Sequence, residues 1–222
     1  MSKTPPMSRY LIPGLGYDHR IFDRLTWPET APTCLNWLEP ERGESIAAYA
    51  GRMAEKIEAQ DGELTLIGHS FGGIMAQEIA AQIPVKKVVL LASVRSRKEI
   101  PLNFRSLAPL RLQYLLSKGL FVGTVRFWGK NHGFVTPEDR ALFISMVKGH
   151  SNRYLRWALR QLSNWEAPEV PVETEIVQIH GTKDGTFPFS RIQRPDVVMK
   201  NGSHIMMYET PEELMDRLLK IL

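Results

Sequence analysis

The chain has 222 residues, 43% of them hydrophobic, and a formal net charge of +4. This length and composition predict one domain, residues 1–222, with a full hydrophobic core. The first residues contain no apolar run of signal-peptide length, and no segment approaches the about 18 apolar residues of a membrane span. We therefore expect a cytoplasmic protein without a membrane span. The single cysteine, Cys34, excludes an internal disulfide and a thiolate metal site.

The positive charge is concentrated in residues 94–170, which hold 13 Lys or Arg and 5 Asp or Glu. This segment carries a net charge of +8, which leaves the remainder of the chain at −4. Half of the aromatic residues lie there as well. No recognised nucleic-acid motif or long basic run accompanies them, so we expect no nucleic-acid partner. Two interpretations stay open: the cations favour a substrate with an anionic group, or they form a solvated outer face.

Six short apolar runs bounded by turn residues predict strands, at residues 8–12, 33–38, 63–67, 85–92, 174–180 and 196–200. Helical spacing occurs at residues 19–25, 45–60, 71–83 and 211–222. This alternation predicts an α/β fold, with a doubly wound, mostly parallel sheet covered on both faces. For the last helix we expect Thr210 as N-cap, Pro211 at the first helical position and Glu213 completing a capping box.

Residues 94–170 interrupt the alternation of strands and helices. Amphipathic stretches at residues 110–118, 137–148 and 153–165 predict helices, and no run in this segment convincingly predicts a strand. No internal repeat, low-complexity tract or flexible linker indicates a second independent domain. We therefore expect a helical cap inserted into one domain.

The strongest motif is Gly68-His69-Ser70-Phe71-Gly72. An apolar run ends directly at Gly68, and a helical pattern starts directly after Ser70. A sharp strand-to-helix turn needs glycine two residues either side of the serine, because a side chain there would collide with neighbouring backbone. Such a turn puts the serine Oγ at a helix N-terminus, where backbone N–H groups stabilise developing negative charge. This context predicts a nucleophile, whereas the pattern alone also fits a glycine-rich connection with a surface serine.

A serine nucleophile needs a base, and the chain offers six histidines. Within the turn, His69 is expected to point away from the serine, and His180, at the end of a predicted strand, is expected to be structural. His204 follows the last predicted strand and precedes the last helix. In a doubly wound sheet that loop lies at the carboxyl edge, on the same side as Ser70. We therefore predict His204 as the catalytic base, with an ordinary loop histidine as the alternative that stays open.

The acid that orients this base is predicted to be Asp184, in the turn after the preceding strand. That turn also lies at the carboxyl edge of the sheet. Two alternatives stay open. The first is an ordinary turn aspartate, since Asp184 precedes a glycine. The second is an acid after the strand at residues 85–92, where the nearest carboxylate is Glu99.

Ser70, Asp184 and His204, in this order at the ends of successive strands, resemble the α/β-hydrolase family over nearly the whole chain. Asp184-x-x-x-Pro188 looks like that family's acid turn, and Gly202-Ser203-His204 looks like its histidine loop. The segment Pro13-Gly14-Leu15-Gly16 is similar to the segment that supplies half of the family's oxyanion hole. The resemblance implies the backbone N–H groups of Leu15 and Phe71 as the two oxyanion donors.

The sequence departs from the family pattern in three places. Pro13 stands where the family usually has His, but the hole should survive because the donor is a backbone group. About seven residues precede the first predicted strand, so the family's first two strands are missing and about six strands are expected. Only 19 residues separate Asp184 from His204. The helix usual there is therefore expected to be reduced to a turn.

A serine nucleophile argues against the family's dehalogenases and epoxide hydrolases, which use aspartate, and it suits acyl transfer. The resemblance implies a carboxylesterase-like serine hydrolase that cleaves a small-molecule ester or thioester through an acyl-enzyme. Two alternatives stay open: an acyltransferase or thioesterase with the same triad, and a ligand-binding or receptor protein with little turnover. No metal-ligand set, phosphate loop or redox motif is present, so we expect no cofactor and no metal.

Overall fold

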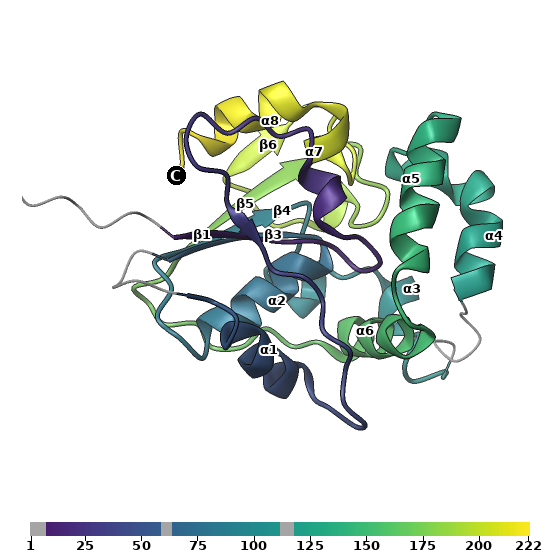
Figure 1. Cartoon of the computed structure of the whole chain (residues 1–222), viewed down its shortest axis with the longest axis horizontal. Helices are drawn as coiled ribbons and strands as arrows, with labels where there is room; N and C mark the ends of the chain where they lie inside the picture. The colour runs from purple at the N-terminus through teal and green to yellow at the C-terminus, as the bar shows by residue number, and fades with distance from the viewer. Residues whose placement is uncertain (1–7, 59–63, 112–117) are drawn as a thin grey trace, which may run out of the picture.

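The computed structural model describes residues 8–58, 64–111 and 118–222. Their centre is a six-stranded sheet in the order β2-β1-β3-β4-β5-β6, with every neighbouring pair parallel (Figure 1). The strands are β1 (Arg9–Ile12), β2 (Thr33–Cys34), β3 (Thr65–His69), β4 (Lys87–Leu91), β5 (Glu175–Gly181) and β6 (Val197–Met199). The prediction of six parallel strands is confirmed. Each of the six predicted apolar runs contains or overlaps one of them.

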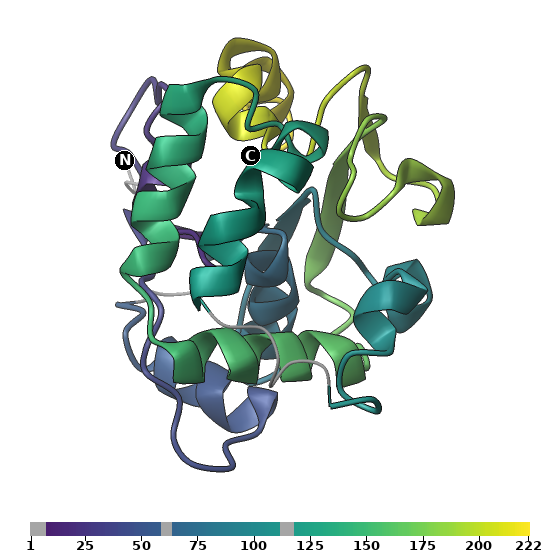
Figure 2. The same ribbon diagram turned by 90° about the vertical axis from the view of Figure 1, so that its right-hand side faces the viewer.

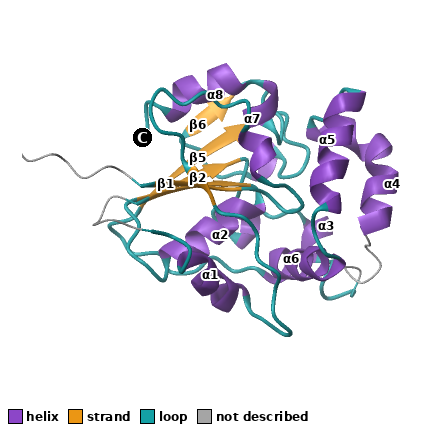
Figure 3. Ribbon diagram, viewed as in Figure 1, coloured by secondary structure: helices purple, strands orange, loops and turns teal. Residues whose placement is uncertain are grey.

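Helices cover both faces of the sheet, as Figure 3 shows. α1 (Ile46–Ala54) and α2 (Phe71–Ala80) lie on one face, and α7 (Met206–Glu209) and α8 (Pro211–Leu218) on the other. The predicted helix at residues 19–25 is a short 3-10 turn, η1 (His19–Phe22). Between β5 and β6 the only helical element is η5 (Phe189–Arg191), which confirms the expected reduction to a turn.

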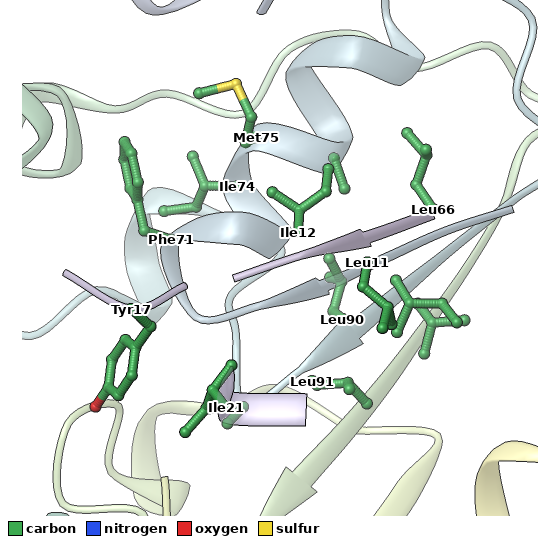
Figure 4. Close-up of a cluster of buried hydrophobic side chains, with 14 of the residues drawn as sticks. Leu11, Ile12, Tyr17, Ile21, Leu66, Phe71, Ile74, Met75, Leu90 and Leu91 are labelled. Carbon is green, nitrogen blue, oxygen red and sulfur yellow. The ribbon is translucent and has the colours of Figure 1, made fainter. Parts of the chain in front are cut away.

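The core lies between the sheet and these helices. The central strands are hydrophobic on both faces, as expected for parallel strands covered on each side. In β1, for example, Leu11 and Ile12 point to opposite faces, and Ile12 lies on the side of Ile74 and Met75 of α2 (Figure 4). This double burial holds the carboxyl ends of the strands, and the loops that follow them, in fixed positions.

A helical insertion, residues 92–174, separates β4 from β5, and its described part contains no strand. The described part consists of η2 (Arg97–Glu99), α3 (Leu102–Arg105), α4 (Lys118–Trp128), η4 (Gly129–His132), α5 (Pro137–Lys148) and α6 (Asn152–Asn164). Figure 2 shows α4, α5 and α6 gathered on one side of the molecule. The helices predicted at residues 137–148 and 153–165 are confirmed. Most of the one predicted at residues 110–118 lies outside the described residues.

The predicted capping box of the last helix is wrong. Pro211 does occupy the first turn of α8, but the side chain of Thr210 makes no capping hydrogen bond. Thr210 also ends α7, and its hydroxyl donates instead to the carbonyl of Met206, 3.2 Å away. Thr210 does occupy the predicted N-cap position of α8, but because α7 runs directly into α8 it is also the C-cap of α7, and its hydroxyl bonds back to that helix.

In the described part of the chain, no helix combines the length and the apolar character that crossing a membrane requires.

Candidate active site

Ser70 occupies the turn between β3 and α2. Its backbone has φ 54° and ψ −120°, a left-handed conformation that a residue with a Cβ adopts only when its surroundings enforce it. Three hydrogen bonds do so. Ser70 N–H donates to the carbonyl of Leu91 (2.9 Å), and its own carbonyl accepts from Gly73 N–H (3.0 Å) and from Ser93 Oγ (2.6 Å). The turn is thus fixed to the end of β4.

The two glycines that flank the serine stand where no side chain fits. A Cβ on Gly68 would lie 2.3 Å from the carbonyl oxygen of Gly72, and a Cβ on Gly72 would lie 2.1 Å from that of Ile12. These distances are shorter than any nonbonded contact, so the backbone would have to move. Both positions therefore require glycine, as predicted from the sequence.

The structure brings Ser70, His204 and Asp184 together at the carboxyl edge of the sheet. Ser70 Oγ lies 2.9 Å from His204 Nε2, and His204 Nδ1 lies 2.9 Å from Asp184 Oδ2. Since Asp184 can only accept when ionised, Nδ1–H donates to it and Nε2 accepts from the serine hydroxyl. All three side chains are buried. The chain of hydrogen bonds therefore runs from hydroxyl to imidazole to carboxylate.

Asp184 is held from four directions. Its Oδ1 accepts from the backbone N–H groups of Thr186 and Phe187, both at 2.8 Å. Its Oδ2 accepts from His204 and lies 3.3 Å from His180 Nε2, which also donates to the carbonyl of Phe187 (2.8 Å). Burial by itself would raise the pKa of Asp184, but His204, His180 and the backbone N–H of Phe187 outweigh it, so the pKa is lowered. The carboxylate is therefore ionised at neutral pH.

His69 contacts the backbone of the predicted base. Its Nε2 donates to the carbonyl oxygen of His204 (3.0 Å), and the two rings are 5.0 Å apart. Burial, together with repulsion from His204, lowers the pKa of His69 to about 3, so its ring is neutral. The expectation that His69 points away from the serine missed this contact. Only its position beside Ser70 in the sequence could have signalled it.

A second support for the histidine loop comes from Ser203 and Glu209. Ser203 Oγ donates to the Glu209 carboxylate and accepts from the N–H of Ile205 (3.1 Å). Burial raises the pKa of Glu209, and the hydrogen bond from Ser203 opposes this change. The loop that carries His204 is thereby tied to the end of α7.

Glu99, the rival acid, is buried in a different network. Its carboxylate accepts from the N–H groups of Arg95 (2.7 Å) and Gln193 (2.9 Å) and from the side-chain amide of Gln178 (3.2 Å). These bonds fasten the segment after β4 to β5 and to the segment before β6. Its partners are therefore loop and strand groups and do not include His204.

Ser70 and His204 border a cavity of about 390 Å³ that is mostly apolar, and Asp184 lies behind His204. Leu15 and Phe71, whose N–H groups were expected to hold an oxyanion, both line it beside Ser70 and His204. The remaining described lining residues are Tyr17, Phe104, Leu120, Thr124, His132, Phe143, Leu159, Leu162, Thr186 and Phe187. No lysine, arginine or carboxylate is among these described lining residues. Elsewhere, too, the described residues contain no group of three or more His, Cys, Asp or Glu arranged to hold a metal ion.

Comparison with known proteins agrees with this architecture. The sequence model of the α/β-hydrolase family matches residues 7–217. An uncharacterized protein of Mycobacterium tuberculosis is 26% identical over 196 residues, which cover 77% of this chain and 57% of that protein. The chain thus spans little more than half the length of the curated relatives it matches.

Solved structures with very different sequences have the same fold. MenH from S. aureus has a TM-score of 0.70 at 14% identity, and the match covers 99% of this chain and 94% of MenH. An esterase from Exiguobacterium antarcticum has a TM-score of 0.65 at 15% identity, covering 96% of this chain and 91% of the esterase. Because the family model matches nearly the whole chain, the protein belongs to the α/β-hydrolase family. The family and the fold class inferred from the motifs are both confirmed.

Proposed function

We propose that the protein is a serine hydrolase that cleaves a carboxylic ester or thioester of a small molecule through an acyl-enzyme on Ser70. The observation that carries this proposal is the hydrogen-bond chain from Ser70 Oγ through His204 to Asp184, which borders a mostly apolar cavity. Membership of a hydrolase family, and the same fold in an esterase, support it.

In the first half of the reaction, Ser70 Oγ attacks the carbonyl carbon of the substrate while His204 Nε2 takes the hydroxyl proton. The imidazolium that forms is stabilised by Asp184, whose carboxylate is ionised. His204 then gives its proton to the departing alcohol or thiol. In the second half, His204 activates a water that releases the acid from Ser70.

The negative charge on the carbonyl oxygen needs donors that are in place before the reaction. We assign this role to the backbone N–H groups of Leu15 and Phe71. Phe71 is the first residue of α2, so its N–H has no carbonyl partner within that helix. The close approach of β1 to α2 at Gly72 keeps the two segments at a fixed separation.

We propose that the helical insertion acts as a cap on a single domain and selects the acyl group. Seven lining residues come from it: Phe104, Leu120, Thr124, His132, Phe143, Leu159 and Leu162. An apolar wall of this kind favours an apolar acyl chain. Because the described lining residues are mostly apolar, we assign a neutral, apolar acyl group.

The decisive experiment is labelling with a fluorophosphonate probe, which captures a serine activated by a base and an oxyanion hole. We expect one label, on Ser70, and none on the Ser70→Ala variant. That variant should stay folded and lose about 10⁴-fold or more in kcat. Labelling that persists in Ser70→Ala would contradict the assignment.

Substrate class is tested with a panel of acyl esters of increasing chain length. We expect kcat/KM to rise from acetyl to longer apolar acyl groups, and to fall when the acyl chain carries a terminal carboxylate. Many turnovers per protein molecule are expected. Release of a single equivalent would indicate a binding protein that is only acylated.

A further inference from the structure

A second concave surface lies on the opposite side of α6 from the catalytic cavity. We call it the arginine groove. It is formed by the loop that precedes α1 and by α6, which Figures 1 and 2 both place side by side. The groove has a volume of about 440 Å³ and is lined by Pro40, Glu41, Arg42, Gly43, Glu44, Arg153, Arg156, Trp157 and Arg160.

Helical spacing explains how the cations converge. Arg153, Arg156 and Arg160 are three and four residues apart in α6, so they share one face of the helix. Leu159 and Leu162, on the other face, line the catalytic cavity. Three of the 13 cations of residues 94–170, Arg153, Arg156 and Arg160, therefore line the groove and not the cavity beside Ser70.

Only some charges in the groove are neutralised. Arg153 pairs with Glu39 (2.6 Å). The two carboxylates that line the groove both face Arg52, Glu44 at 2.8 Å and Glu41 at 3.7 Å. In the described part of the chain, no carboxylate lies within 4.0 Å of the guanidinium groups of the other three arginines that line the groove, Arg42, Arg156 and Arg160.

One of these three is also partly desolvated. The Nε–H of Arg156 is buried and has no hydrogen-bond acceptor. A buried charged donor without an acceptor is destabilising unless a bound group supplies one. Together with the three guanidinium groups that lack a described carboxylate within 4.0 Å, this donor makes the groove a surface poor in acceptors, which a ligand rich in acceptor oxygens would complement.

The walls of the groove are held together without using these cations. Trp157 Nε1 donates to the carbonyl of Glu44 (2.9 Å), and Gln161 Nε2 donates to the same oxygen (3.3 Å). The loop is thereby fastened to α6. A ligand would therefore meet guanidinium groups on a preformed surface, which lowers the entropic cost of binding.

We propose that the arginine groove binds a phosphate-bearing small molecule through Arg42, Arg156 and Arg160. Guanidinium groups present two parallel N–H donors that match phosphate oxygens, and three of them suit a ligand with two or more negative charges. The concave shape favours a small anion over the flat face of an acidic protein. The proposal is independent of the proposed hydrolase activity, because none of these arginines lines the catalytic cavity.

The test is calorimetric titration of the whole chain with pyrophosphate, inorganic phosphate and glycerol phosphate. The double variant Arg156→Gln/Arg160→Gln is compared with a control of equal charge, Arg217→Gln/Lys220→Gln, at exposed positions in and just after α8. We expect the groove variant to bind pyrophosphate about tenfold more weakly or worse, and the control to bind like the wild type. Tighter binding of glycerol phosphate than of inorganic phosphate would identify a phosphoester as the ligand, and the reverse would identify free phosphate.

Three results would overturn the proposal. The first is that none of the three anions binds measurably to the wild type. Another is equal weakening in both double variants, which would indicate attraction to net charge alone. The third is tight binding of a polyglutamate peptide without binding of pyrophosphate, which would assign the groove to an acidic protein. Circular dichroism verifies that each variant is folded, and unchanged ester hydrolysis separates this site from the catalytic one.

Discussion

At the scale of single residues, the carboxylate of Asp184 combines interactions that an amide cannot reproduce. It accepts two backbone N–H groups on one oxygen and the His204 Nδ1–H on the other. Asparagine keeps the size of the side chain but presents only one acceptor oxygen, and its NH₂ group cannot accept from His204. The tautomer of His204 that suits the serine would lose its support.

We therefore predict that Asp184→Asn stays folded and lowers kcat by about 10⁴-fold, because the imidazolium loses its stabilising charge. The measurement is steady-state hydrolysis of an ester that the wild type turns over, with folding checked by circular dichroism. The matched control is Glu99→Gln, at the other buried carboxylate near the sheet edge, which should retain turnover within about tenfold. Near wild-type activity for the first variant and collapse for the second would move the acid to Glu99.

At the scale of elements, the strands and the turn that carries Ser70 were predictable because local sequence determines them. Strand β3 and helix α2 are both hydrophobic, and the turn between them is fixed by Gly68 and Gly72. The positions of Ser70, Asp184 and His204 then follow from parallel topology, which brings the carboxyl ends of successive strands to one edge.

Other features depend on packing between distant segments, so sequence patterns did not reveal them. The contacts of His69 with the His204 carbonyl and of His180 with Asp184 arise only when the strands are assembled. α3 is too short to show helical spacing. Whether the arginines of α6 line the cavity beside Ser70 or the arginine groove likewise depends on how that helix is oriented in the folded protein.

Two glycines in helices provide a matched pair for testing the steric requirement of the turn at Ser70. A Cβ on Gly72 would overlap the backbone of Ile12, whereas a Cβ on Gly123, in α4, would meet no atom within 4 Å. We predict that Gly72→Ala lowers the free energy of unfolding by about 2 kcal/mol or more. Gly123→Ala should raise it by about 0.5–1 kcal/mol, because alanine favours the helix.

Urea unfolding of the two variants beside the wild type measures both effects. The prediction fails if Gly72→Ala is as stable as the wild type, since the backbone would then have accommodated a methyl group at no cost. A destabilised Gly123→Ala would instead show that α4 is packed more closely than the space around Gly123 indicates.

At the scale of the whole molecule, buried histidines link folding to pH. The pKa of His69 is lowered to about 3, chiefly by burial, and burial also lowers the pKa values of His180 and His150. In the unfolded chain these rings take up protons below about pH 6.5. Between that pH and the lower folded pKa values, the unfolded state therefore binds more protons than the folded state. Stability contributed by the neutral rings is fully present above about pH 6.5 and is lost as the pH falls.

The carboxylate of Asp184 acts in a lower window. Its pKa is lowered on folding, so the stability that it contributes is present above the ordinary pKa of an aspartate, about 4, and is lost only in more acidic solution. Unfolding experiments between pH 7 and pH 5 therefore lie above the window of Asp184, and the contribution of one histidine is isolated by comparing the wild type with a variant that lacks it. An exposed histidine changes its surroundings little on folding and should contribute little to the slope.

We predict that the free energy of unfolding decreases from pH 7 to pH 5, and that His69→Gln makes this decrease shallower. Glutamine cannot take up a proton, yet its amide can still donate to the His204 carbonyl. The wild type takes up one proton at residue 69 when it unfolds between pH 6 and pH 5, because the unfolded histidine is protonated there. Without that proton, the free energy of unfolding changes by about 1.4 kcal/mol less per pH unit. The measurement is urea unfolding at pH 7, 6 and 5, with His19→Gln, at an exposed position, as the control. If His69→Gln and His19→Gln gave the same slope as the wild type, His69 would be protonated in the folded protein and its neutral role beside His204 would be wrong.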